Sequence, residues 1–377
     1  MSEVIHGTVA PGYEAVRTAF RSACAGQGDS VVQLVAYVRG ERVVDLWNGG
    51  DDAADFMLPI YSATKGAAYL VLADLFQGGH VDLDAPVCEF WPEFAAAGKE
   101  KVSVRELVSH RAGLIGTAAG FSMCELADDT SITHLLAAQE PYWEPGRAYG
   151  YHAFTAGALT NGLVRSVTGD SVQQIFDRSW RQKHGLDVYL GEPPADRVLP
   201  VLPPPRVDAP TTVPGGVDAK LRRIAFNQHH PVPTDLVELG NDRSLQEAGP
   251  ASVGGVASAR GLARMYAVAG TGTDGADPVI ADEITTAFAR LQTPGVDVVT
   301  GRVDRFAVGF EATGNKYDSL SDRAFGHSGA GGCEAFADPD LSLAYAYTRQ
   351  RFAATGGEAP ENDQLIRAIA EAATLDR

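Results

Sequence analysis

The sequence predicts an α/β (α+β) fold: an antiparallel sheet flanked by N- and C-terminal helices, with an inserted, mostly helical domain. Two strand patterns follow an N-terminal helical pattern, and further strand patterns precede a C-terminal amphipathic helix at 364–375. Between these ends, the patterns are those of helices and loops. Because the strands come from both ends of the chain, we expect a discontinuous sheet domain, 1–81 and 255–377, and a helical domain, 82–254.

Composition narrows the class of protein. The 377 residues are 45% apolar and 21% charged, which is ordinary for a globular protein, and the net charge of −17 argues against a nucleic-acid or anionic-membrane partner. No apolar run is long enough to span a bilayer, and the first residues lack the basic start and apolar block of a signal peptide. We therefore expect a cytoplasmic protein with reduced thiols at its scattered cysteines: Cys24, Cys88, Cys124 and Cys333.

The N-terminal part reads as helix, hairpin and second helix. Apolar residues recur with helical spacing over 12–20. Two apolar, β-branched runs at 31–38 and 43–47 are separated by Gly40-Glu41 and predict a hairpin. The helix that starts at Ser62 follows and ends near 78–79. Together these elements favour a sheet covered by helices.

The remaining elements fall into a helical middle and a strand-rich end. Helices are expected at 102–110, 132–139, 155–168, 172–180 and 258–267, and strands at 306–310, 324–327, 334–337 and 341–347. A Pro-rich segment at 193–233 contains Pro203-Pro204-Pro205 and reads either as a lid or binding loop or as a flexible surface excursion.

The stretch around Ser62-Ala63-Thr64-Lys65 is the strongest chemical signal. Residues at i and i+3 share a helix face, so the Ser62 hydroxyl and the Lys65 amine can touch. Burial beneath an apolar helix lowers a lysine pKa, and a neutral amine beside a hydroxyl is a nucleophile–base pair. The alternative is a helix-capping serine followed by a solvated lysine. The apolar run that follows, Ala-Ala-Tyr-Leu-Val-Leu-Ala, favours the buried pair.

Two further stretches are candidates for the same site. Tyr151 follows a Pro-Gly turn, and its phenol could act as a general base or relay a proton, although simple packing is an alternative. The glycine-rich stretch 325–332 could bring backbone close to a substrate and supply an oxyanion N–H, or could be a plain turn. Its G-x-S-x-G-like sequence around Ser328 cannot complete a Ser-Asp-His triad, because no histidine follows His327.

These stretches, taken in order, resemble a known family. Ser62-Ala63-Thr64-Lys65, Tyr151-His152-Ala153 and His327-Ser328-Gly329 look like the three motifs of the serine β-lactamase and penicillin-binding-protein superfamily. The closest match is the class C-like branch, which includes the family VIII carboxylesterases. Flanking phrases at 104–114 and 143–146 agree, and the resemblance covers about residues 10 to 370.

The resemblance implies a role for each motif residue. Ser62 would be the acylated nucleophile, Lys65 would deprotonate it or tune the base, and Tyr151 would shuttle a proton to the leaving group. The backbone N–H groups of Ser62 and Ala330 would form the oxyanion hole. The remaining motif residues would line the substrate site: His152, Ala153, His327, Ser328 and Gly329.

Two departures from the family pattern point towards esters. Ala153 stands where lactamases carry an asparagine that hydrogen-bonds a substrate amide. His327 stands where they carry a lysine, and a histidine near its reference pKa is mostly neutral at pH 7, so it holds a carboxylate less firmly.

We therefore expect a carboxylesterase that acts on small or medium esters through an acyl-Ser62 intermediate, without a cofactor or a metal. The alternatives are a transacylase that passes the acyl group to an amine or alcohol, a β-lactamase or D-Ala peptidase, and a non-catalytic ligand-binding relative. The natural acyl donor, the acceptor and the oligomeric state stay open.

Overall fold

The fold is organised by an antiparallel sheet that joins the two ends of the chain. The structure, a computed structural model, describes residues 4–28, 30–204, 217–353 and 359–375. Its larger sheet has the order β1-β3-β2-β10-β9-β8-β7. The strands are β1 (His6–Val9), β2 (Val32–Val38), β3 (Glu41–Trp47), β7 (Glu311–Ala312), β8 (Phe325–Ser328), β9 (Glu334–Asp338) and β10 (Leu343–Arg349). The pairing of β2 with β10, in which Val38 lies opposite Leu343, confirms that both ends contribute strands.

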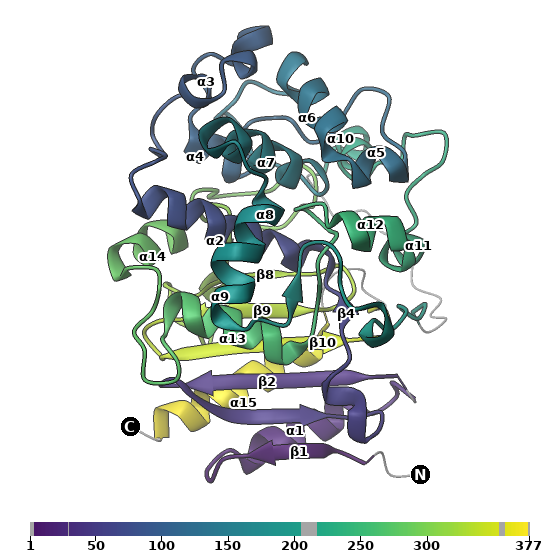
Figure 1. Ribbon diagram of the computed structural model, residues 1–377, viewed down its shortest axis with the longest axis vertical. Coiled ribbons are helices and arrows are strands. Elements are labelled where there is room, and N and C mark those ends of the chain that lie inside the picture. Colours follow the sequence, from purple (N-terminus) through teal and green to yellow (C-terminus); the bar gives the residue numbers. More distant parts are fainter. Residues whose placement is uncertain (1–3, 29, 205–216, 354–358, 376–377) are drawn as a thin grey trace.

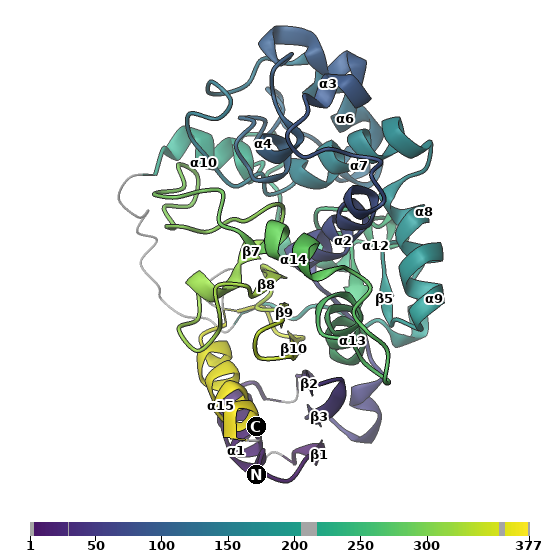
Figure 2. The same ribbon diagram turned by 90° about the vertical axis from the view of Figure 1, so that its left-hand side faces the viewer.

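Helices cover both faces of this sheet (Figure 2). The terminal helices α1 (Glu14–Cys24) and α15 (Glu361–Leu375) pack against each other on one face. On the opposite face α13 (Ala259–Gly270) lies across β2, β9 and β10. Every residue of β2 is buried, as expected for a strand that is covered on both sides. The predicted sheet flanked by terminal helices is confirmed.

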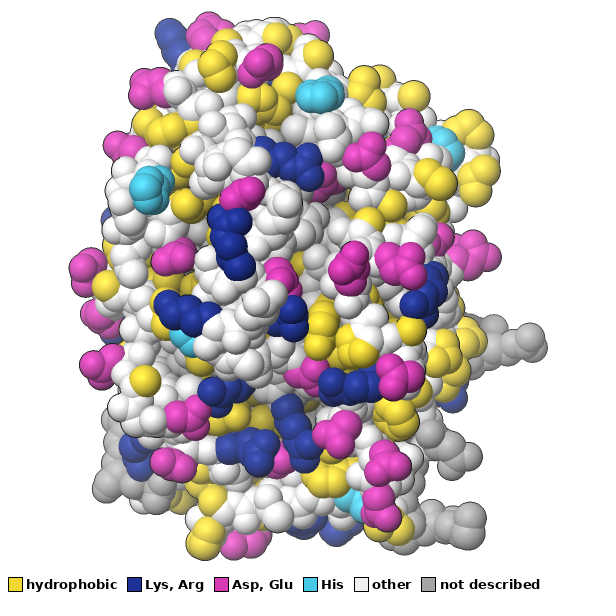
Figure 3. All heavy atoms as spheres, viewed as in Figure 1, with side chains coloured by type: hydrophobic (Ala, Val, Ile, Leu, Met, Phe, Trp, Pro, Cys, Tyr) yellow, Lys and Arg dark blue, Asp and Glu magenta, His cyan; other side chains and the backbone are white. Residues whose placement is uncertain are grey.

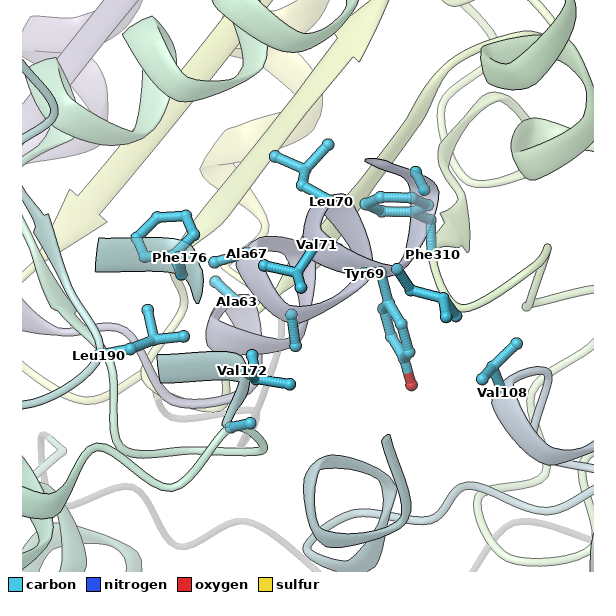
Figure 4. Close-up of a cluster of buried hydrophobic side chains, with 14 of the residues drawn as sticks. Ala63, Ala67, Tyr69, Leu70, Val71, Val108, Val172, Phe176, Leu190 and Phe310 are labelled. Carbon is cyan, nitrogen blue, oxygen red and sulfur yellow. The ribbon is translucent and has the colours of Figure 1, made fainter. Parts of the chain in front are cut away.

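The helix α2 (Thr64–Gln77) lies at the centre of the molecule, between the sheet and the other helices (Figure 1). Its residues are buried continuously from Thr64 to Ala73. Apolar side chains from several elements surround it, among them Val172, Phe176 and Phe310 (Figure 4). A helix buried on all sides belongs to the core, which confirms the buried helix predicted behind Ser62. Lys65 is carried into the core on its first turn.

The remaining helices lie either beyond α2, away from the larger sheet, or beside it at the level of α2 and α13 (Figures 1 and 2). They are α3 (Val87–Phe90), α4 (Val104–Val108), α5 (Met123–Ala127), α6 (Asp129–Ala138), α7 (Thr155–Thr168), α8 (Val172–Phe176), α9 (Gln182–His184), α10 (Ala219–Ala225), α11 (Leu236–Asn241) and α12 (Arg243–Ala248), while α14 (Asp282–Ala289) packs beside α2. A second, small sheet has the strand order β4 (Leu58–Pro59), β6 (Val256–Ala257) and β5 (Val188–Tyr189). It therefore brings together three segments that are distant in sequence.

Two expectations need correction or restriction. The strand predicted at 306–310 is wrong: β7 begins at Glu311, because Ala307 N–H bonds locally to the Phe310 carbonyl and Gly309 has a φ of +79°. The Pro-rich segment contains a helix, α10, and its residues 205–216, including Pro205, lie outside the described residues. Within the described ranges, no helix has the length and apolar character that crossing a membrane requires.

We predict that Gly157→Ala destabilises the protein by about 1–3 kcal/mol, because the new Cβ would overpack the core. This Cβ would lie 2.2 Å from the backbone nitrogen of Ser252 and 2.5 Å from the carbonyl carbon of Ala251, and backbone cannot move aside as a side chain can. Thermal unfolding followed by circular dichroism measures the effect. Ser166→Ala, at an exposed position of the same helix, is the control and should leave the melting temperature nearly unchanged. A Gly157→Ala protein as stable as the control would contradict the prediction.

Candidate active site

The nucleophile candidate Ser62 sits on a tight turn that leads into α2. A 3₁₀ turn, Tyr61–Ala63, precedes the helix, and Tyr61 has a φ of +49°, a left-handed conformation that is rare for a bulky residue. Burial holds Tyr61 in place: its hydroxyl donates to the Leu236 carbonyl at 2.8 Å, and its ring meets Phe352 edge-on. Backbone strain of this kind is concentrated at functional sites. The turn places Ser62 at the wall of a cavity.

Lys65 is the best-defined group of the site. Its side chain is buried, and Nζ donates to the carbonyls of Ala153 at 2.7 Å and Ser252 at 2.9 Å, while lying 3.2 Å from Ser62 Oγ. Burial lowers the Lys65 pKa to about 7, although the Glu311 carboxylate acts in the opposite direction. A neutral amine has two N–H groups and one lone pair. With both N–H groups bound to carbonyls, the lone pair is free to accept the Ser62 hydroxyl proton.

Tyr151 completes the group. Lys65 Nζ lies 5.1 Å from the centre of its ring, and its hydroxyl is within hydrogen-bonding reach of the Ser62 side chain. Burial raises the pKa of the Tyr151 phenol, and the contact with Ser62 only partly opposes this effect. The phenol is therefore protonated at neutral pH. This environment favours Tyr151 as a proton donor over the phenolate base that the sequence also allowed.

The glycine-rich turn lies directly against the nucleophile turn. A Cβ on Gly329 would lie 2.2 Å from the Ile60 carbonyl oxygen, and one on Gly331 would lie 3.0 Å from the Tyr61 ring. Hydrogen bonds from Gly329 N–H to Cys333 O and from Gly332 N–H to Gly329 O close the turn. These glycines thus let two backbone segments meet, and the turn places Ala330 beside Ser62 on the cavity wall.

The two motif histidines lie behind the cavity wall, although the sequence predicted that they would line the substrate site. His152 Nε2 accepts the Leu114 N–H at 3.0 Å and its Nδ1 donates to Gly150 O at 2.7 Å, so both ring nitrogens are occupied by backbone. His327 Nδ1 donates to the Ser328 carbonyl at 2.8 Å. Burial lowers the pKa of each histidine to about 4, so both are neutral. Neither histidine lines the cavity, whereas Ala153, Ser328 and Gly329 do.

A buried acidic residue, Glu311, was missed from the sequence. It accepts hydrogen bonds from Ser328 Oγ at 2.7 Å and Arg305 Nη2 at 3.0 Å. Burial alone would raise its pKa, but the cations of Arg305 and Lys316 hold that pKa well below its usual range. Glu311 is therefore a fixed negative charge beside the site. It follows a segment that reads as a strand and belongs to no motif, so only the folded structure could reveal it.

Asp297 was missed for the same reason. Its carboxylate accepts the backbone N–H of Tyr151 at 3.2 Å, that of Val299 at 2.7 Å and that of Thr300 at 2.9 Å. It thereby ties the loop around residue 300 to the backbone that carries Tyr151. The Asp297 side chain is fully buried and does not line the cavity, so it supports Tyr151 from behind.

The cavity in front of these residues has a volume of about 400 Å³, within the range typical of small-molecule sites. Its wall combines aromatic and aliphatic side chains with three arginines and Glu311. Across the part of the chain that the structure describes, no group of acidic, histidine and cysteine side chains is arranged to hold a metal ion.

The chain is similar to known proteins over most of its length. The Beta-lactamase family profile matches residues 16–373. The esterase/beta-lactamase LipL of Mycobacterium tuberculosis is 31% identical over 373 residues, which cover 92% of this chain and 83% of LipL.

Solved structures of two relatives superpose over nearly the whole chain. EstA of Arthrobacter nitroguajacolicus is 35% identical with a TM-score of 0.89, covering 98% of each chain. A family VIII carboxylesterase is 32% identical with a TM-score of 0.86, covering 98% of this chain and all of the other. Since the profile and these relatives span almost the entire sequence, the chain belongs to the Beta-lactamase family.

Proposed function

We propose that the protein is a serine carboxylesterase that forms a covalent acyl-Ser62 intermediate on small or medium esters. The observation that carries the proposal is the hydrogen bonding of Lys65. Two carbonyls bind its N–H groups, burial lowers its pKa to about 7, and Ser62 Oγ lies 3.2 Å away. The esterase and carboxylesterase names of the relatives support the same chemistry.

In the proposed mechanism, neutral Lys65 accepts the Ser62 hydroxyl proton as Oγ attacks the ester carbonyl. The N–H groups of Ser62 and Ala330 stabilise the resulting oxyanion. Ser62 N–H lies in the first turn of a helix, where it has no intrahelical acceptor, and within the described ranges Ala330 N–H donates to no protein acceptor.

The leaving group departs with a proton. Tyr151, whose hydroxyl adjoins Ser62, gives its proton to the leaving alkoxide, and the proton held by Lys65 replaces it. Water then attacks the acyl-enzyme by the reverse sequence of proton transfers and releases the acid. Ala153 offers no side-chain amide to bind a substrate amide, which favours esters over lactams. An amine or alcohol that replaced water in this step would make the protein a transacylase.

We expect Ser62→Ala to abolish acyl-enzyme formation, since no other hydroxyl lies beside Lys65 Nζ among its described contacts. Intact-protein mass spectrometry after brief mixing with 4-nitrophenyl hexanoate should show one added acyl group in the native protein and none in the variant. Ser22→Ala, at an exposed site on α1, is the control and should acylate normally. Acylation of Ser62→Ala would disprove the assignment. Decay of the adduct with and without added amine separates hydrolysis from acyl transfer.

The pH dependence should follow the protonation of Lys65. Because the reactive amine is neutral, kcat/KM should rise with pH, about tenfold per pH unit below the Lys65 pKa, and level off above about pH 8. His152 and His327 have pKa values near 4 and should not contribute to this inflection. Ester hydrolysis measured between about pH 5 and 9 tests this, and Lys65→Arg should be inactive because a guanidinium stays charged. A flat profile over that range would exclude Lys65 as the base.

Asp297→Asn should lower kcat about tenfold with a smaller effect on KM, because an amide cannot accept all the N–H groups that the carboxylate accepts. Tyr151 would then lose its fixed position while the cavity wall stays in place. Steady-state kinetics on 4-nitrophenyl hexanoate measures both constants. Asp304→Asn, in the same loop, is the comparison, because within the described residues its carboxylate accepts a hydrogen bond from Gly295 N–H alone. An equal effect of the two changes would argue for general loop damage.

A further inference from the structure

One of the stretches that resemble the family, 104–114, contains a buried histidine that takes no part in the proton transfers described above. His110 follows α4, and its side chain is completely buried. Other histidine side chains reach the outer face seen in Figure 3, where acidic and basic groups are interspersed and water can satisfy both ring nitrogens. His110 has no such access to water, so its ring nitrogens depend on protein groups.

His110 binds the backbone on both sides of Tyr151. Its carbonyl accepts the Gly150 N–H at 3.1 Å, and its ring Nδ1 accepts the His152 N–H at 3.2 Å. The N–H of Tyr151 itself is held by the Asp297 carboxylate. All three backbone N–H groups from 150 to 152 are therefore fixed, two of them by the same residue.

The hydrogen bond from His152 N–H determines the tautomer of His110. A nitrogen that accepts a hydrogen bond carries no proton, so in the neutral ring the proton is on Nε2. Burial lowers the pKa of His110 well below its ordinary value, which keeps the ring neutral and Nδ1 able to accept. Within the part of the chain that the structure describes, Nε2 has no hydrogen-bond partner. An apolar side chain could fill the same space without this cost, so the Nδ1 acceptor is what the histidine supplies.

The His110 ring also contacts the Tyr151 ring. The two ring centres are 5.2 Å apart, and the ring planes meet at 67°. Phe306 lies parallel to Tyr151 at 5.4 Å, and the centre of the His110 ring is 4.2 Å from that of Phe306. The three rings thus pack against one another, and aromatic contacts of this kind favour particular relative orientations. Tyr151 is held through both its backbone and its ring.

We propose that His110 is a positioning residue for Tyr151, which it holds so that the phenol reaches the leaving group. The inference rests on the proposed esterase function and names a further residue on which that reaction depends. As the bond between the carbonyl carbon and the leaving oxygen breaks, the electron pair stays on that oxygen, and the Tyr151 hydroxyl proton moves to it. The proton held by Lys65 then moves to Tyr151. His110 itself exchanges no proton in these steps.

The expected defect of a displaced Tyr151 depends on the leaving group. Ethoxide has to be protonated as it departs, whereas 4-nitrophenolate is a stable anion that leaves without a proton. A misplacement of about 1 Å can cost about a hundredfold in rate. Displacing Tyr151 should therefore slow acylation by ethyl hexanoate far more than acylation by 4-nitrophenyl hexanoate. General damage to the fold would slow both reactions equally.

Two variants of nearly equal shape isolate the acceptor. In His110→Asn the side-chain oxygen can take the place of Nδ1, and asparagine tolerates the left-handed φ of +63° at this position. In His110→Leu no acceptor remains, and the His152 N–H is left unpaired.

The quantity measured is the ratio of kcat/KM for ethyl hexanoate to kcat/KM for 4-nitrophenyl hexanoate. We expect His110→Leu to lower this ratio about tenfold, because the proton donor is displaced, and His110→Asn to keep most of it. His134→Leu, at an exposed position of α6, is the control and should leave the ratio unchanged. Partial unfolding of a variant does not change the ratio, because both constants scale with the amount of folded protein.

A double-mutant cycle tests whether the effect passes through Tyr151. Tyr151→Phe removes the proton donor and should lower the same ratio further than His110→Leu does. In the Tyr151→Phe background, His110→Leu should then leave the ratio where it is, because no phenol remains to be positioned. A further fall of the ratio in the double variant would overturn the inference.

The outcomes separate this inference from the proposed function. Hydrolysis through acyl-Ser62 with the same ratio in the native protein and in His110→Leu would overturn the inference and leave the esterase function standing. Turnover of neither ester by the native protein would overturn both.

Nitrogen NMR of the histidine rings tests the geometry in the unmodified protein, whether or not the variants fold. At neutral pH we expect His110 in its neutral form, with the proton on Nε2 and with Nδ1 unprotonated. A proton on Nδ1 would overturn the inference, because that nitrogen could not then accept the His152 N–H.

Discussion

The structure of this site depends on how the Lys65 amine is buried. Burying an ammonium group in the core costs free energy. Here two backbone carbonyls accept hydrogen bonds from the amine, and its pKa is lowered so that the neutral form is accessible. One carbonyl, of Ala153, comes just before α7, and the other, of Ser252, comes after α12. The lysine itself is on α2. The amine is therefore held correctly only when three segments distant in sequence have packed together, so the chemistry is linked to the tertiary fold.

The same arrangement stores energy at the nucleophile. Tyr61 occupies a left-handed conformation that costs about 1–3 kcal/mol for a residue of its kind, and Lys65 adds the cost of burying an amine. The apolar surface that α2 buries on all sides offsets these terms. The continuous apolar run after Lys65 thus has a purpose beyond core filling: it keeps an unfavourable turn and an unfavourable amine in place.

Much of the fold could be predicted from the sequence because local patterns carried it. The hairpin at 31–47 and α7 follow clear periodicities, and the structure has them at nearly the predicted bounds. The strand predicted at 306–310 failed for a physical reason. Phe306, Val308 and Phe310 alternate like strand residues, but they are buried in turns around Gly309, and Phe306 lines the cavity. Alternating apolar residues indicate that one side of a segment is buried, and a well-packed loop can show the same alternation as a strand.

The site residues likewise divide into those that local sequence patterns indicate and those that only the tertiary structure reveals. Ser62, Lys65 and Tyr151 were predictable because their chemistry is written in short motifs. Asp297 and Glu311 act through tertiary contacts: Asp297 accepts the Tyr151 backbone N–H, and Glu311 binds Arg305. No local sequence pattern predicts these contacts. The histidines show the opposite failure: they stand in motif positions, yet backbone groups occupy both ring nitrogens of His152 and Nδ1 of His327.

The charges around Ser62 affect which substrates the site can discriminate. At neutral pH the Tyr151 phenol is protonated and both motif histidines are neutral, while burial lowers the Lys65 pKa to about 7. Among the described residues that line the cavity, fixed positive charge comes from arginines. The reacting centre therefore does not provide a permanent cation for an anion beside the scissile bond, as a lysine at position 327 would.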